Sequence, residues 1–285
     1  MATVALIVHE VREDAEYHAR RLAAWLADRG HKLAVLQENV DELNIEGAVR
    51  EPDELAEGAS LVVSLGGDGS MLRAVELAAQ HGVAALGVNF GQLGYLTEVE
   101  PDGMLDAVER ALSDAVQIEQ RMRVIASVFK ESGEVIAAGH GLNEALVERE
   151  KSGHTVRLGV SIDGEFFQSY SADGVIVASP TGSTAYSLSA RGPIVAPAHE
   201  ALIVTAVSPH QLFDRSMVLN PDSIVEIEVL PGRNASLSLD GRSPLHLVPG
   251  DRVRCTRSPI PGLIVSQRGA DFLNVLKTKF GLSDR

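Results

Sequence analysis

Residues 61–79 read LVVSLGGDGSMLRAVELAA. An apolar run leads into a glycine-rich turn with one acid, Asp68, at its crest, and a helical pattern follows. Glycines on both sides of the acid let backbone N–H groups approach a phosphate, and the positive end of the following helix points at the same place. The stretch therefore predicts a phosphate-handling loop that carries a base, formed by Gly66, Gly67, Gly69 and Ser70. A structural turn whose acid only caps the helix is the alternative.

The composition is typical of a soluble globular protein. Its 285 residues suffice for one large domain or two ordinary ones, and 22% charged and 45% hydrophobic residues are ordinary values. No apolar run approaches the length of a membrane span, and the first residues have the pattern of a strand rather than a signal peptide. A single cysteine, Cys255, excludes an intramolecular disulfide and favours a reducing cytoplasm.

The net charge of −14 argues against a nucleic-acid partner, because phosphate backbones need a basic surface. The same charge means that a phosphate-bearing ligand would need local cations, a metal ion or oriented N–H dipoles. The glycine loop offers the last of these.

Strands and helices alternate in the first part of the chain. This alternation predicts a Rossmann-like parallel sheet with helices on its faces, in an α/β domain over residues 1–120. A helical pattern ends at Arg29-Gly30, and an acidic connection precedes the glycine loop. The expected strands are 4–8, 32–36, 61–65 and 84–88, and a second amphipathic helix is expected over 104–112.

From Arg121 onward, short β-rich runs predict an all-β, sandwich-like domain over residues 121–265. Asp163-Gly164 and Asp240-Gly241 each lie between strand-like runs, where type I′ hairpin turns are favoured. The expected strands include 124–129, 156–162, 165–170, 175–178, 224–230 and 237–239. The last segment, 266–285, has a helical pattern and is expected to return to the first domain. With no evident linker, we expect a rigid interface with a ligand cleft between the domains.

Three further segments carry polar or glycine-rich patterns. A glycine-bearing loop over residues 89–98 follows the fourth strand and should lie beside the first loop, at the binding edge of the sheet. Asn143-Glu144 offers a carboxamide that can pair with an adenine edge and a carboxylate that can accept from ribose hydroxyls. The alternative for residues 89–98 is an ordinary strand-to-helix connection. The alternative for Asn143-Glu144 is a solvated polar pair.

The densest segment is DGVIVASPTGSTAYSLS, residues 173–189. It joins a strand to a hydroxyl-rich turn that opens a helix. Gly182, Ser183 and Thr184 can present donors to a ligand, and Tyr186 supplies a ring for stacking. A plain helix cap would need only one such hydroxyl, so a binding role is favoured.

The four segments, in this order, resemble the NAD kinase family over nearly the whole chain. The motifs are Gly66-Gly67-Asp68-Gly69, residues 91–97, Asn143-Glu144 and residues 180–186. The glycine loop alone is shared with phosphofructokinases and diacylglycerol-type lipid kinases, whereas the last two motifs point to the NAD kinases. The resemblance implies phosphorylation of NAD⁺ at the 2′-hydroxyl of its adenosine ribose.

The resemblance also implies roles for individual residues. Asp68 would be the catalytic acid/base. NAD would be bound by Asp68, Gly69, Arg73, Asn143, Glu144, His154, Asp173, Thr181, Thr184, Ala185, Tyr186 and Ser189. Three positions depart from the family pattern: Arg191 replaces a small residue, Arg242 stands where glutamine is common, and Ser171 stands where some relatives carry arginine. The two arginines either strengthen phosphate contacts or form surface salt bridges.

The implied substrates are NAD⁺ and either ATP or polyphosphate, with Mg²⁺ arriving on ATP to neutralise its phosphates. The histidines do not have zinc-ligand spacing, so no protein-held metal is expected. The implied assembly is a homodimer or homotetramer, with no membrane partner. Two alternatives stay open: a lipid kinase with the same loop and a comparable β domain, and an NAD(P)-binding sensor without catalysis.

Overall fold

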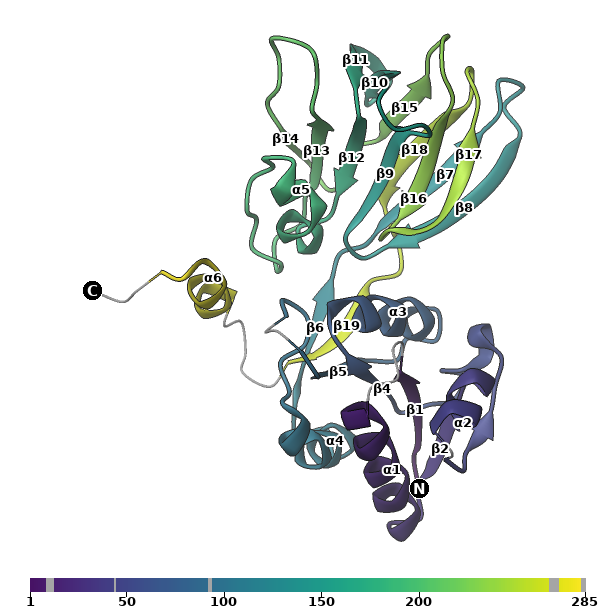
Figure 1. The fold of residues 1–285 in the computed structure, drawn as a ribbon, viewed down its shortest axis with the longest axis vertical. Helices are drawn as coiled ribbons and strands as arrows, with labels where there is room; N and C mark the ends of the chain where they lie inside the picture. Colours follow the sequence, from purple (N-terminus) through teal and green to yellow (C-terminus); the bar gives the residue numbers. More distant parts are fainter. Residues whose placement is uncertain (9–12, 44, 92–93, 267–271, 283–285) are drawn as a thin grey trace. The chain divides into compact units, whose positions relative to one another are not determined.

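The computed structural model describes residues 1–8, 13–43, 45–91, 94–266 and 272–282. These residues form two compact units (Figure 1). The first unit contains Met1–Gln120 together with Gly262–Arg285, and the second contains Arg121–Pro261. No described helix combines the length and hydrophobicity that crossing a bilayer requires.

The first unit is an α/β domain built on a seven-stranded sheet with the strand order β3-β2-β1-β4-β5-β19-β6. Each adjacent pair from β3 through β19 is parallel, which confirms the predicted α/β architecture. The strands are β1 (Thr3–Val8), β2 (Lys32–Val35), β3 (Ala48–Val49), β4 (Leu61–Gly66), β5 (Ala85–Asn89), β6 (Gln117–Arg121) and β19 (Gly262–Ser266). The helices are α1 (Glu13–Asp28), α2 (Gln37–Leu43), α3 (Asp68–Ala79), α4 (Met104–Leu112) and α6 (Phe272–Phe280).

Helices cover both faces of this sheet, which explains why its central strands are continuously apolar. Val4, Leu6 and Val8 of β1 belong to one buried cluster with residues of α1 and α4. Helix α3 contacts β1, β4, β5 and β19, and it lies on the opposite face from α1 and α4 (Figure 1). The glycine loop connects β4 to α3 and so lies at the carboxyl end of the sheet.

Residues 262–265, expected in the all-β domain, instead belong to β19 of the parallel sheet. Ile264 is in register with Ala85 of β5. The prediction placed this run by its neighbours in sequence. Its continuous apolar pattern is the one that a strand covered on both faces requires.

The acidic connection before the glycine loop contains helix α2, which the sequence analysis did not predict. Val40 and Leu43 are three residues apart on this helix and both pack into the core. At the other end of the chain, helix α6 forms where a helical pattern was expected, but none of its residues is buried. The Lys279 ammonium lies 4.5 Å from the centre of the Tyr95 ring.

The second unit is a β-sandwich of two six-stranded sheets, ordered β11-β10-β15-β18-β7-β8 and β14-β13-β12-β9-β16-β17. One buried cluster contains residues of both sheets, which confirms the sandwich-like fold. The strands of the first sheet are β7 (Val124–Phe129), β8 (Val135–Gly141), β10 (Val156–Ile162), β11 (Glu165–Ala172), β15 (Val225–Val229) and β18 (Arg252–Arg257). The strands of the second sheet are β9 (Glu144–Arg149), β12 (Gly174–Ala178), β13 (Leu202–Val207), β14 (Met217–Leu219), β16 (Ala235–Leu239) and β17 (Arg242–Leu247).

The two Asp-Gly pairs form the hairpin turns that the sequence predicts. Asp163 and Gly164 have φ values of 52° and 88°, and they connect β10 to β11. Asp240 and Gly241 have φ values of 50° and 71°, and they connect β16 to β17. Positive φ at both central residues is the signature of a type I′ turn.

Candidate active site

The glycine loop in the first unit places Asp68 in the first turn of helix α3. Asp68 is thus the first helical residue rather than the crest of the turn, with Gly67 as the N-cap. Gly66 has φ of +155°, and a Cβ atom there would lie 2.1 Å from Ser70 Oγ, so only glycine fits. Cβ atoms built at Gly67 and Gly69 would meet nothing within 4 Å, which leaves the backbone of the loop open to a ligand.

The loop after β5 holds the Asp68 carboxylate. Asp68 Oδ2 accepts the backbone N–H of Tyr95 at 2.8 Å, and Oδ1 accepts that of Leu96 at 3.0 Å. A Cβ atom at Gly94 would lie 2.1 Å from Asp68 Oδ1, so a larger residue would displace the acid. The expectation that the two loops lie side by side is confirmed, although Gln92 and Leu93 fall outside the described residues.

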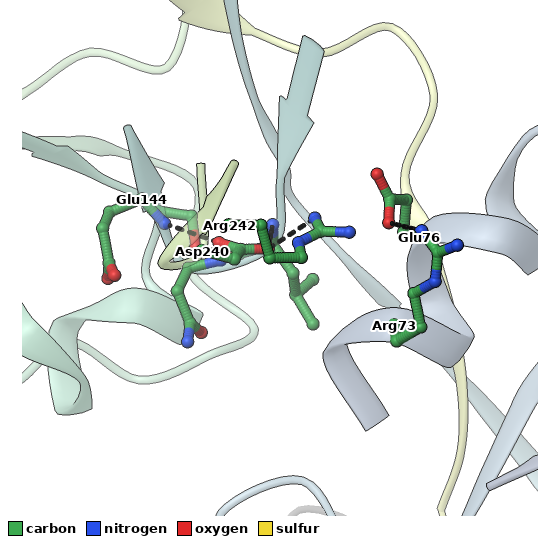
Figure 2. Close-up of polar contacts among 8 residues, drawn as sticks. Arg73, Glu76, Glu144, Asp240 and Arg242 are labelled. Atoms are coloured by element: carbon green, nitrogen blue, oxygen red, sulfur yellow. Dashed lines mark hydrogen bonds and ion pairs between the residues drawn. The ribbon is translucent and has the colours of Figure 1, made fainter. Parts of the chain in front are cut away.

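Arg73, one and a half turns further along α3, forms an ion pair with Glu76. Their side chains approach to 2.8 Å and are both about one-third exposed (Figure 2). Glu76 was not predicted as a partner of Arg73, although a spacing of three residues on a helix is a signal for such a pair.

In the second unit, Asn143-Glu144 stands at the start of β9 and is held by the carboxylate of Asp240. Asp240 Oδ2 accepts the N–H of Leu142 at 2.7 Å, while Oδ1 accepts those of Asn143 at 2.8 Å and Glu144 at 3.1 Å. Figure 2 shows Asp240 between Glu144 and Arg242, whose guanidinium is 3.7 Å from Oδ2. Asp240 was predicted only as a turn residue, because nothing in its neighbouring sequence indicates a bond to a residue 97 positions away.

Glu144 is buried, not solvated as the alternative would require. It is 8% exposed, and its Oε2 has no hydrogen-bond partner among the described residues. Burial, reinforced by the neighbouring charge of Asp240, raises the pKa of Glu144 from 4.5 to about 8. Its carboxyl group is therefore largely protonated at neutral pH and can donate as well as accept a hydrogen bond.

A buried arginine, which the sequence analysis missed, compensates the charge of Asp240. Arg123 is 2% exposed, and its Nε and Nη1 have no hydrogen-bond partner in the described part of the chain. Burial lowers the pKa of Arg123, and the charge of Asp240 opposes that shift. Burial raises the pKa of Asp240, while the three amide bonds and Arg123 oppose the rise.

The hydroxyl-rich segment packs against Asn143. Ser179 donates its backbone N–H to Asn143 O at 2.8 Å. A Cβ atom at Gly182 would lie 2.1 Å from that same carbonyl oxygen, so the close approach requires glycine. The segment forms a short 3₁₀ turn, Thr181–Thr184, and then a single helical turn, α5 (Tyr186–Ser189).

Several of the donors expected to face a ligand are instead hydrogen-bonded within the protein, which corrects the expectation that they face a ligand. The amide of Gly182 donates to Ser179 Oγ at 3.2 Å, and the hydroxyl of Ser183 donates to Val195 O at 3.1 Å. Thr184 Oγ1 donates to Thr181 O at 3.2 Å. The buried Thr181 Oγ1 has no hydrogen-bond partner among the described residues.

Tyr186 presents a ring that is 40% exposed. Burial, followed by the charges of Glu148 and Asp173, raises the pKa of its phenol. Asp173 itself is ion-paired with Arg149, a partner that sequence reasoning missed. Ala185 is the N-cap of α5, and Ser189 is the last residue of that helix and is exposed.

His154 lines a cavity of about 340 Å³ in the second unit. The cavity is rich in cationic groups, which a protein of net charge −14 needs if it is to hold an anion. Its lining residues are Arg149, Glu150, Lys151, His154, Gly232, Arg233 and Asn234. Ser171 does not line it and instead bonds Thr155 Oγ1 at 3.2 Å.

The two unexpected arginines have different surroundings. Arg191 is exposed and has φ of 69°, directly before Gly192, where a Cβ atom would lie 2.2 Å from Ser187 Oγ. Arg242 is the ion-pair partner of Asp240 described above. Within the described ranges, no group of three or more His, Cys, Asp or Glu side chains could hold a metal ion.

Comparison with known proteins identifies both halves of the chain. Residues 4–119 match the ATP-NAD kinase N-terminal domain, and residues 142–266 match the ATP-NAD kinase C-terminal domain. An NAD kinase of Desulforamulus reducens is 35% identical over 98% of this chain and 97% of its own length. An NAD kinase of Thermobifida fusca is 37% identical over 98% of this chain and 89% of its own.

Two solved structures share the fold. Yeast NADH kinase in complex with NADH superposes with a TM-score of 0.91 at 24% identity, over 100% of this chain and 89% of that one. An NAD kinase from Archaeoglobus fulgidus in complex with ATP superposes with a TM-score of 0.79 at 22% identity, over 99% of this chain and 100% of that one.

Proposed function

Because this chain belongs to the NAD kinase family, we propose that it transfers the terminal phosphate of ATP to the 2′-hydroxyl of the adenosine ribose of NAD⁺, giving NADP⁺. Both halves of the chain match ATP-NAD kinase domains, at residues 4–119 and 142–266. The lipid-kinase alternative is therefore set aside.

The observation that carries the mechanism is the fixed carboxylate of Asp68. Two backbone amides, from Tyr95 and Leu96, orient it at the first turn of α3. A ribose hydroxyl is a weak nucleophile, but phosphoryl transfer has a loose transition state that demands little activation of it. Asp68 would therefore align the hydroxyl and accept its proton late in the transfer. The open backbone at Gly67 and Gly69, with Gly66 and Ser70, would approach the phosphates.

The remaining proposed roles belong to NAD binding. The Asn143 carboxamide would pair with the adenine edge, and Glu144 would hydrogen-bond ribose hydroxyls. Tyr186, the first residue of α5, would stack on a ring of the ligand, with Ala185 just before the helix and Ser189 at its end. The cations around His154 favour an anionic ligand, and Arg73, Asp173, Thr181 and Thr184 complete the proposed set.

Mg²⁺ would arrive bound to ATP as part of that substrate, where it neutralises the charge of the phosphates. The described residues offer no cluster that would hold it independently, and no step is assigned to a protein-held metal. We also propose a cytoplasmic homodimer or homotetramer, with the lone buried Cys255 in keeping with a reducing compartment. Light scattering of the purified chain measures the oligomeric state.

The test incubates the purified protein with NAD⁺ and Mg-ATP and measures NADP⁺ with an NADP-specific dehydrogenase. Formation of NADP⁺ supports the proposal, and dehydrogenase specificity for the 2′-phosphate verifies the position of transfer. Tight NAD(P) binding without product would identify a sensor instead, and that result would overturn the proposal. Parallel reactions with polyphosphate in place of ATP, and with NADH in place of NAD⁺, define the donor and acceptor.

A further inference from the structure

We propose that Asp240 is a positioning residue, whose carboxylate holds the backbone of Asn143-Glu144 in the conformation that receives NAD⁺. The inference rests on the proposed function, since it assigns NAD⁺ as the ligand of Asn143 and Glu144. Asp240 acts through those residues and has no contact with substrate assigned to it.

One carboxylate serves three consecutive amides, those of Leu142, Asn143 and Glu144. The backbone adds a fourth bond in the opposite direction, because Asp240 donates its own N–H to Glu144 O at 3.1 Å. Space around this contact is tight: a Cβ atom at Gly141 would lie 2.8 Å from Glu144 O and 2.9 Å from Asp240 Oδ1. The turn between β16 and β17 therefore fixes the start of β9.

The Asp240 carboxylate accepts more backbone amides than a turn of this type requires. In the matching turn, Asp163 also donates its N–H to a backbone carbonyl, Ile224 O at 2.9 Å. Its carboxylate, however, accepts one backbone amide, that of Ile224 at 2.7 Å, and the hydroxyl of Ser223 at 3.1 Å. Asp240, by contrast, is a side chain only 1% exposed that lies close to a second buried acid, Glu144. Burying two neighbouring acids is unfavourable unless the carboxylate is well hydrogen-bonded and compensated.

The compensation comes from two arginines. Arg123 is buried and attracts Asp240 electrostatically, and Arg242 approaches Oδ2 to 3.7 Å. Arg242 thus has a structural role: its positive charge lies beside the buried carboxylate of Asp240. Asp240, with Arg123 and Arg242 beside it, therefore holds the Asn143-Glu144 dipeptide, and the Asn143 carbonyl also packs against Gly182.

The test is Asp240→Asn, with Asp163→Asn as the matched control. Asparagine keeps the size of the side chain but replaces one accepting oxygen with an NH₂ group. That NH₂ group would face a backbone N–H, so two donors would meet. We expect the KM for NAD⁺ to rise on the order of tenfold in Asp240→Asn, as loss of a charge-assisted bond implies. The KM for ATP should stay within about twofold of the wild-type value, and Asp163→Asn should leave both KM values unchanged.

Titration calorimetry with NAD⁺ alone measures the same effect without turnover, with an expected rise in Kd on the order of tenfold. An unchanged KM and Kd for NAD⁺ in folded Asp240→Asn, or equal rises in both KM values, would overturn the inference. If circular dichroism shows that Asp240→Asn is unfolded, Asp240→Ser, whose hydroxyl can accept one amide, takes its place with the same criteria. Absence of NADP⁺ formation by the wild-type enzyme would instead count against the proposed function, so the two failures are distinguishable.

Discussion

Tyr95 donates its backbone N–H to Oδ2 of Asp68 at 2.8 Å, although the two residues are separated by 27 positions: Asp68 begins helix α3, and Tyr95 lies in the loop after β5. This bond, with the parallel one from Leu96, orients the acid by backbone groups that no side-chain substitution removes. The orientation of Asp68 therefore depends on the course of the loop after β5.

Replacing Asp68 by asparagine should lower kcat by a factor on the order of 10²–10⁴, the range for loss of a general acid/base. The Kd for NAD⁺ should change much less, because the residues proposed to bind NAD⁺ are mostly elsewhere. Steady-state kinetics and calorimetry on the same preparation give both values. Near-normal turnover in this variant would remove Asp68 from the mechanism.

Gly94→Ala should lower kcat on the order of tenfold or more, because the new methyl group would lie 2.1 Å from Asp68 Oδ1 and 2.5 Å from Thr97 Oγ1. Gly91→Ala is the matched control in the same loop, since a Cβ atom there meets nothing within 4 Å. Both variants are assayed for NADP⁺ formation and for melting temperature. Equal activity of the two variants would contradict a steric role for Gly94.

Glu144→Gln should change how stability depends on pH. The pKa of Glu144 is raised from 4.5 to about 8 in the folded protein, so the folded state holds a proton that the unfolded chain has lost. Glu144 should therefore lower the free energy of unfolding of the wild-type protein as the pH rises from 4.5 to about 8. Its contribution is fully lost above pH 8. Glutamine stays neutral and avoids that loss.

Melting curves of both proteins are measured at pH 5 and at pH 9. The melting temperature of Glu144→Gln minus that of wild type should be on the order of 5 °C larger at pH 9 than at pH 5. Asp240 is present in both proteins, so the pH dependence that it contributes independently of Glu144 cancels in the comparison. A difference in melting temperature that does not vary with pH would show that Glu144 ionises normally in the folded protein.

Removal of divalent metal should abolish turnover and leave the fold intact. EDTA strips Mg²⁺ from ATP, and within the described ranges the protein has no side-chain cluster that would need a metal for stability. We expect activity to return on addition of Mg²⁺ and the melting temperature to shift by less than about 1 °C, a shift that corresponds to a fraction of a kcal/mol. A drop of several degrees on chelation would reveal a structural metal.

Local chemistry made much of the architecture predictable. Asp163-Gly164 and Asp240-Gly241 specify their turn type because both central positions need positive φ. The apolar pattern of the central strands likewise predicts a sheet covered on both faces. Strand β19 was assigned to the wrong domain, because a pattern gives the type of a strand but not its partner.

The candidate site was predictable to the extent that its motifs are contiguous. The glycine loop and Asp68 are adjacent in the sequence, and so are Asn143 and Glu144, so both motifs could be recognised from the sequence. The hydrogen bond from the Asn143 N–H to Asp240 Oδ1 and the ion pair of Arg149 with Asp173 join residues far apart in the sequence that strand pairing brings together. The protonation of Glu144 depends on burial and on Asp240, neither of which appears in the adjacent sequence.

The position of β19 between β5 and β6 bears on how the protein is made. On the ribosome, β5 and β6 are synthesised long before residues 262–266, so both expose unpaired backbone until nearly all of the chain has emerged. The second unit, continuous from Arg121 to Pro261, can close its hydrogen bonds earlier. A nascent chain that stalls before Gly262 would therefore carry a finished sandwich beside an α/β sheet with open, aggregation-prone edges.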